Sequence, residues 1–330
     1  MHKKLFIVIL LVMTLSLTGC THYVKNSDGG VVRDKETGQS LVSNILCQPT
    51  DENMTKLYEK NKVKIDKLPT CAEFTPADGG YEGIWSTLFI KLLSWLIIKI
   101  GEVVKNFGLA IVIVTLIIRL IIFPISKKSA MQSENMKKAS KDMQKLQNKY
   151  KGKTSQEDQM KQAQEMMALY KKHGINPMAG CLFAFIQMPL FFAFLESLYR
   201  IPAVFEGNFL TFNLGTSPFS ALFGNSFSFS HLISSFSTGS WVYILLPIIV
   251  GLATFFSFKM NSGLNTGMSN PDQEKQMKMM MNIMLVFIIF ASFTMSTSII
   301  IYWIVGSLFT IGQTLYIRRN KDARDSKERS

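Results

Sequence analysis

The stretch Gly108-Leu-Ala-Ile-Val-Ile-Val-Thr-Leu-Ile-Ile-Arg119-Leu-Ile-Ile-Phe-Pro124 is an apolar run that contains one arginine. Placing a guanidinium in hydrocarbon costs from about 3 kcal/mol on insertion scales to more than ~10 kcal/mol in simulations of lone helices. Because arginine keeps its proton in proteins, Arg119 must either extend to water or occupy a polar cavity. The basic residues Lys127 and Lys128 follow closely, so snorkelling of a long side chain to the surface is one of the two alternatives.

The composition is that of a membrane protein. The chain has 330 residues, of which 48% are hydrophobic and 25 are Phe, and its mean hydropathy is +0.19. The net charge of +13 would favour nucleic acid in a soluble protein. Here the lysines cluster between apolar runs, so the charge indicates cytoplasmic loops and contact with anionic lipids rather than recognition of a nucleic-acid sequence.

The first residues are typical of a targeting signal. A basic start and a short apolar run lead to Leu17-Thr-Gly-Cys20, which resembles a bacterial lipobox. The resemblance implies a lipoprotein signal peptide over 1–19, cleavage before Cys20 and a lipid on that cysteine; the alternative is an ordinary signal peptide. Residues 20–83 are polar and are predicted to form an extracytoplasmic tether, with a short helix near 54–64. A disulfide between Cys47 and Cys71 is permitted there but not required.

The remaining sequence predicts an all-α membrane protein with five transmembrane helices. Residues 84–106 mix apolar and charged residues and predict an amphipathic helix at the membrane interface, or else a long entry to the first span. The predicted spans are 107–125, 178–198, 240–258, 277–293 and 297–317.

The distribution of lysine and arginine predicts the orientation. Basic residues concentrate in 126–176, between spans three and four, and in the tail 318–330, whereas the loop 199–239 holds Arg200 and no lysine. By the positive-inside rule the N-terminus is outside and the C-terminus is cytoplasmic. This orientation agrees with a lipid anchor on an extracytoplasmic Cys20.

The basic segment 126–176 predicts an antiparallel helical hairpin. One seam of small and apolar residues steps by three and four: Met136, Ala139, Met143, Leu146 and Tyr150. A second seam has the same spacing: Met160, Ala163, Met167 and Tyr170. The two seams are expected to pack on each other.

Several polar side chains fall inside predicted spans. They include Thr115 and Arg119 in the first, Gln187 in the second, and Gln313, roughly in line with Trp303, in the last. A single polar residue usually joins two helices, but together these residues predict a hydrated groove open to the cytoplasm. The sequence shows no catalytic motif, no metal-ligand spacing and no cofactor or small-molecule site.

Three motifs together resemble the YidC/Oxa/Alb membrane protein insertase family. They are Thr115-Leu-Ile-Ile-Arg119, the run from Asn176 through Gln187 to Ala193, and Tyr302-Trp303 with Gln313, and the lipobox resembles the Gram-positive type. In place of a frequent Pro-x-Gly turn before the last span, this sequence has Met295-Ser-Thr-Ser-Ile. The resemblance implies an insertase core over 84–317 that acts without bond chemistry, in the bacterial cell membrane.

The implied partners are nascent membrane proteins, with a Sec-type translocon and the ribosome as further candidates. The implied groove residues are Arg119, Thr115, Gln187, Trp303 and Gln313. The alternative function is a lipid-anchored transporter or channel subunit. That class is expected to carry paired charges or broken helices at the membrane midplane.

Overall fold

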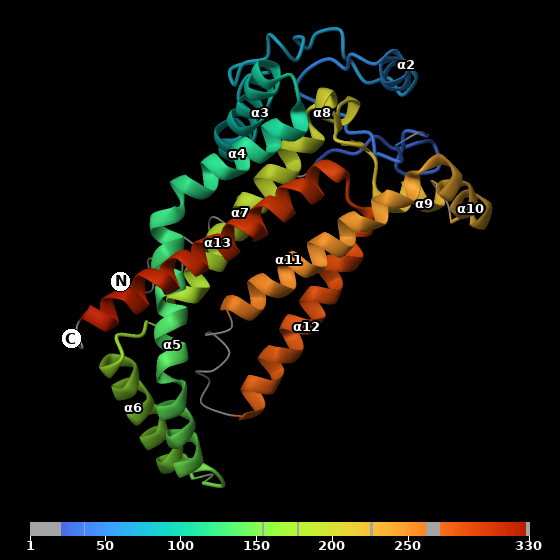
Figure 1. The fold of residues 1–330 in the computed structure, drawn as a ribbon. Coiled ribbons are helices and arrows are strands. Elements are labelled where there is room, and N and C mark those ends of the chain that lie inside the picture. The colour runs from blue at the N-terminus through green and yellow to red at the C-terminus, as the bar shows by residue number, and fades with distance from the viewer. Residues whose placement is uncertain are drawn as a thin grey trace. The chain divides into compact units, whose positions relative to one another are not determined.

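The computed structural model describes residues 21–35, 37–153, 155–176, 178–224, 227–261 and 271–327. The predicted signal peptide and Cys20 lie outside these residues. Nearly all regular structure is helical (Figure 1). The helices are α2 (Glu52–Lys60), η1 (Trp85–Ile90), α3 (Lys91–Val104), α4 (Phe107–Ile121), α5 (Phe123–Tyr150), α6 (Gln156–Lys172), α7 (Met178–Tyr199), α8 (Pro202–Glu206), α9 (Pro218–Phe223), α10 (Phe229–Thr238), η2 (Ser240–Ile244), α11 (Leu245–Asn261), α12 (Pro271–Thr294) and α13 (Thr297–Lys327). Strands β1 (Asn208–Phe209) and β2 (Phe212–Asn213) form one short antiparallel hairpin.

The chain divides into two compact units. The first consists of Met1–Ile117, Gln187–Val250 and Ile289–Val305, and the second of Ile118–Ile186, Gly251–Ile288 and Gly306–Ser330. Each unit is described by itself below.

Two helical stretches in the described part of the chain are long and apolar enough to cross a membrane, Ser240–Met260 and Thr297–Asn320. A third candidate is the pair α4 and α5, if the two helices count as one span despite a bend of 67°. The predicted span 178–198 coincides with α7, and 277–293 lies within α12. These two spans stay predictions, because the structure establishes them as helices and not as crossings.

The bend between α4 and α5 has a local cause. Pro124 stands in the first turn of α5, after Ile122. Proline has no N–H and its ring clashes with the carbonyl four residues earlier, so a helix that runs into proline is interrupted there. The predicted span 107–125 therefore ends its regular helix at Ile121.

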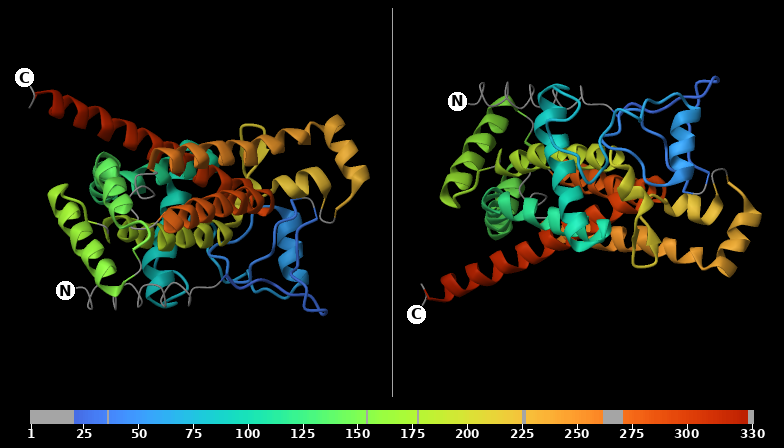
Figure 2. Two further views of the ribbon diagram at one scale, coloured as in Figure 1. Left: turned by 90° about the horizontal axis from the view of Figure 1, so that it is seen from below. Right: turned by 90° about the horizontal axis from the view of Figure 1, so that it is seen from above.

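Helices α5 and α6 pack side by side (Figures 1 and 2). Lys149 on α5 lies 2.7 Å from Glu165 on α6, and Asp142 on α5 lies 3.0 Å from His173, which follows α6. Residues earlier in α5 therefore pair with residues later in the second helix, so the two helices run antiparallel. The first predicted seam, from Met136 to Tyr150, is buried.

The second predicted seam lies on the wrong face of α6. Met160 and Met167 are exposed, whereas Met166 is buried and Leu169 packs beside it. Tyr170 is the one apolar residue shared by the predicted and the observed faces. The observed face is rotated by about one residue, or 100°, from the predicted one.

The described part of the segment 21–83 is folded, and its role as an extracytoplasmic tether stays a prediction. Val24, Leu41, Val42, Ile45, Tyr58 and Ile65 form a buried cluster. Asp51 caps α2 by accepting a hydrogen bond from the Met54 amide at 2.9 Å. Cys47 and Cys71 form a disulfide. The short helix expected near 54–64 is α2, which begins and ends slightly earlier.

Replacing both cysteines of this disulfide with serine should destabilise the segment 21–83 by about 3 kcal/mol, since the bond closes a loop of intermediate length. Limited proteolysis of the membrane-embedded protein measures this as faster cleavage between residues 48 and 70. Cleavage at the wild-type rate would contradict the prediction.

Two predicted boundaries are changed by the structure. The predicted interfacial helix 84–106 is present as η1 and α3, with Ile84, Leu88 and Leu92 exposed at a spacing of four residues. This apolar face suits a membrane surface, which stays a prediction. At the other end, α13 continues as helix to Lys327, so the predicted tail 318–330 begins as part of a long helix.

Candidate functional site

Arg119 lies in the last turn of α4, and its guanidinium lies against Gly306 of α13. A Cβ atom placed at Gly306 would come within 2.4 Å of the Arg119 Nη2 atom. The guanidinium therefore occupies the space that the missing side chain leaves. Gly306 lies nine residues after Thr297, which is about 14 Å along the helix at 1.5 Å per residue. Arg119 thus contacts the interior of a candidate membrane span, within the second unit.

A second contact joins α5 to the same helix, α13. The Ser126 hydroxyl donates to the Gln313 Oε1 atom at 3.0 Å. Gln313 is seven residues after Gly306, so the two residues lie on one face of α13. The junction of α4 and α5 therefore packs along this face, where the contacts of Arg119 and Gln313 lie about two turns apart. That these two residues line a groove stays a prediction.

Thr115, Gln187 and Trp303 belong to the first unit. The Thr115 side chain is buried, and its hydroxyl donates to the Ile111 carbonyl at 2.6 Å within its own helix. Gln187 and Trp303 are half-buried. The role of these three residues in a groove stays a prediction.

An aromatic wall joins α7 to the beginning of α13. The Phe194 and Tyr302 rings stack with centroids 4.1 Å apart, and the Phe191 and Trp303 rings meet edge to face at 5.2 Å. Aromatic pairs at these separations each contribute about 1 kcal/mol beyond the apolar area that they bury. The helix that carries Gln187 is thereby fixed against the helix that carries Trp303.

Sequence reasoning missed two features of the second unit. Gly306 gave no signal, because a glycine in an apolar helix is ordinary until its neighbour is known. The other feature is a charged junction around Glu134, which accepts hydrogen bonds from Arg318 at 2.7 Å and from Lys137 at 3.1 Å. Both cations also donate to the Met260 carbonyl at the end of α11. Arg318, predicted only as part of a basic tail, therefore joins α13 to α5.

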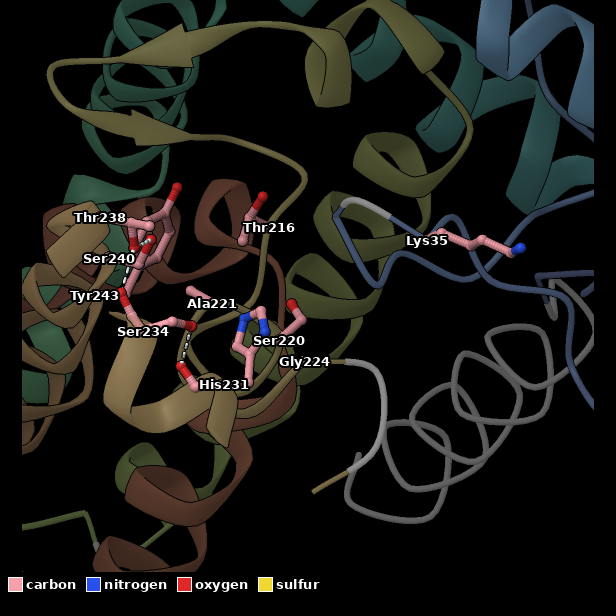
Figure 3. Close-up of a pocket in the computed structure, with 10 residues that line it drawn as sticks. All are labelled: Lys35, Thr216, Ser220, Ala221, Gly224, His231, Ser234, Thr238, Ser240 and Tyr243. Carbon is pink, nitrogen blue, oxygen red and sulfur yellow. Dashed lines mark hydrogen bonds between the residues drawn. The ribbon is translucent and has the colours of Figure 1, made fainter. Parts of the chain in front are cut away.

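The first unit contains a separate cavity of about 320 Å³ (Figure 3). Hydroxyl groups dominate its lining, among them Ser220, Ser234, Thr238 and Ser240. Ser234 already donates to the His231 carbonyl. Of the ten lining residues only Lys35 carries a permanent charge, and Figure 3 shows its side chain directed away from the others. The cavity therefore differs from the positively charged groove that the sequence predicts.

Known proteins resemble most of this chain. The family 60Kd inner membrane protein, which is the YidC/Oxa1 family, matches residues 99–325. The chain belongs to this family. A protein named membrane protein insertase YidC from Oceanobacillus iheyensis is 34% identical over 255 residues, covering 76% of this chain and 91% of the relative.

Two other relatives agree with this assignment. Membrane protein insertase YidC from Alkalihalophilus pseudofirmus is 37% identical over 257 residues, covering 76% of this chain and 89% of the relative. Membrane protein insertase MisCA from Bacillus subtilis is 36% identical over 235 residues, covering 71% of this chain and 79% of the relative. The YidC/Oxa1 match begins at residue 99, so the folded segment 21–83 lies before it.

Proposed function

We propose that this protein is a membrane protein insertase that passes hydrophilic segments of nascent membrane proteins through a positively charged intramembrane groove. The observation that carries the proposal is the Arg119 guanidinium against Gly306, in the interior of α13. A permanent cation at that depth is costly unless it faces a polar or hydrated space. Membership of the YidC/Oxa1 family and the printed names of the relatives support the same function.

The groove acts by shortening the dry path across the membrane. A hydrophilic segment must otherwise cross about 30 Å of hydrocarbon. Water in the groove lowers this cost. The fixed positive charge attracts acidic residues of the crossing segment, since the low-dielectric surroundings screen the attraction less than bulk water does. The residues assigned to the groove are Arg119, Thr115, Gln187, Trp303 and Gln313. No bond is made or broken, so insertion is driven by partitioning and, for charged segments, by the membrane potential.

The apolar helix of the substrate leaves the groove sideways into lipid. The helices assigned to this exit are α11 and α12. Large apolar side chains are exposed on both of them: Leu252, Phe255 and Phe256 on α11, and Ile283, Val286, Phe287 and Phe290 on α12. Met280 and Met284 are exposed as well, and methionine adapts to apolar partners of many shapes.

The proposed topology has five spans, with an extracytoplasmic N-terminus anchored through a lipid on Cys20 and a cytoplasmic C-terminus. The support is the concentration of lysine and arginine in 126–176 and 318–330. In this topology the pair α5 and α6 receives substrate on the cytoplasmic side. Its basic surface faces anionic lipids, a Sec-type translocon and the ribosome.

Labelling of a cysteine tests the groove directly. In a Gln187→Cys variant in which Cys181 is also replaced, a membrane-impermeant thiol reagent should react from the cytoplasmic side, because the groove is hydrated from there. Inverted membrane vesicles present that side and intact cells present the other. A cysteine at Leu252, on the proposed lipid-facing surface, is the matched control and should stay unlabelled. Absence of labelling at position 187 in both preparations would contradict the groove.

A further inference from the structure

Arg200 is the single lysine or arginine of the loop 199–239, and it is buried rather than exposed to lipid headgroups or water. Only 1% of its surface is accessible. Positive charges are rare in extracytoplasmic loops, and a buried charge is costly unless it is paired and hydrogen-bonded. An arginine in this position therefore needs a structural reason.

The guanidinium of Arg200 joins three parts of the first unit. Its Nε atom donates to the Asn44 carbonyl at 2.6 Å, its Nη1 atom to the Ser86 hydroxyl at 2.7 Å, and its Nη2 atom to Glu82 at 2.7 Å. Asn44 belongs to the folded segment 21–83, and Ser86 to η1. Arg200 itself follows the last residue of α7. One side chain thus ties the extracytoplasmic segment and η1 to the outer end of α7.

Two buried cations, Arg200 and Lys91, share the Glu82 carboxylate. The Glu82 carboxylate also pairs at 3.2 Å with Lys91, which is fully buried. Lys91 in turn donates to the carbonyls of Asp78 and Gly80, each at 2.7 Å. Burial opposes ionisation of Glu82, but the Arg200 guanidinium and its hydrogen bond outweigh burial, and the pKa of Glu82 is lowered. The carboxylate therefore stays ionised and the junction persists at neutral pH.

The same end of α7 receives further contacts from the segment 21–83. Tyr199 packs against the buried cluster of that segment and meets the Tyr23 ring edge to face at 6.4 Å. The Leu46 amide donates to the Arg200 carbonyl at 2.9 Å. A separate contact goes to α8, where the Thr50 amide donates to Glu206 at 3.0 Å.

We propose that Arg200 is a positioning residue that fastens the folded segment 21–83 to the outer end of α7 and so holds the aromatic wall between α7 and α13. Phe194, which forms this wall with Tyr302, lies six residues before Arg200, within two helical turns, and Tyr302 directly precedes Trp303 on α13. The segment 21–83 lies before residues 99–325, which match the family model. The inference rests on the proposed function, because the wall carries the groove residues Gln187 and Trp303. The role of the fastening by Arg200 is to keep the groove closed toward the outside.

The test uses the full-length protein with Gln187→Cys and compares labelling from the two sides of the membrane. Arg200→Met removes the guanidinium but leaves Glu82 paired with Lys91, so no carboxylate is left unpaired. We expect labelling from the outside to rise by about fivefold or more, which corresponds to a weakening of the closed wall by about 1 kcal/mol. Arg200→Lys should restore part of the closure, because an ammonium reaches Glu82 but does not replace all three contacts.

Glu206→Gln is the matched control, since it weakens another contact of the segment 21–83 without touching α7. Its labelling should stay within about twofold of wild type. Ser86→Ala removes one of the three contacts and gives an intermediate value if Arg200→Met fails to accumulate. Formation of the Cys47–Cys71 disulfide, read by gel mobility, verifies that the segment has folded.

The outcomes separate the two proposals. If the parent protein is labelled from the cytoplasm and the Arg200 variants are labelled from the outside no faster than the parent, the positioning role is wrong and the groove stands. If the parent is labelled from neither side, the groove itself is wrong.

Discussion

Replacing Arg119 with alanine should lower the insertion of substrates that carry acidic residues in the segment to be translocated, while the protein stays in the membrane. A pair of opposite charges 4 Å apart is worth about 4 kcal/mol at an effective dielectric constant of 20. Substrate carboxylates are not fixed at one position, so only part of this energy is gained. We expect a loss of insertion rate of about tenfold or more, equivalent to ~1.4 kcal/mol. Arg119→Glu should lose more, because it repels the same segment.

A panel of single-span substrates measures this effect, with between zero and three acidic residues in the outer segment and protease protection as the readout. Lys128→Ala provides the matched control, because it removes an equal charge from an exposed position on α5. The loss in Arg119→Ala should grow with the number of acidic residues, whereas Lys128→Ala should insert the whole panel normally. Equal insertion of all substrates by Arg119→Ala would mean that the arginine only orients its helix.

Adding a single methyl group at Gly306 should reproduce much of this loss. The new Cβ of Gly306→Ala would lie 2.4 Å from the Arg119 Nη2 atom, so the guanidinium must leave its position. The end of an arginine side chain is flexible and moves at little cost. We therefore expect a well-folded protein whose charge is displaced, with insertion of acidic substrates reduced by about fivefold.

Gly312→Ala is a close control on the same helix, since a Cβ atom there would have no neighbour within 4 Å. Both substitutions raise helix propensity by about 1 kcal/mol, so a change in the intrinsic stability of α13 affects both alike. Only Gly306→Ala should reduce insertion, and only for substrates with acidic outer segments. A similar reduction in both variants would show that flexibility of α13, rather than the place of Arg119, matters for insertion.

The sequence predicted most helices because their signals are local. Apolar runs, basic loops and the spacing of Met136, Ala139 and Met143 are visible without any knowledge of partners. The second seam failed because Met160, Met166 and Met167 offer α6 two apolar faces. Which face is buried depends on α5, and sequence spacing alone does not contain that information.

Of the residues in the candidate site, the sequence singled out only those that are chemically unusual for an apolar helix. Arg119 is conspicuous in an apolar run, and Gln313 is conspicuous in the last span. Gly306 contributes by having no side chain, so its importance appears only when Arg119 is seen beside it. The folded segment 21–83 was missed for a related reason. Its fold includes a disulfide and contacts with Arg200 and Tyr199, which are distant in sequence.

The unbroken course of α13 has a mechanical consequence. Its 31 residues extend for about 46 Å at 1.5 Å per residue, which is longer than a bilayer core of ~30 Å. The helix passes Gly306 and continues without interruption beyond Arg318. A displacement of its C-terminal turns is therefore expected to reach the surroundings of Arg119, within the second unit, through continuous helix.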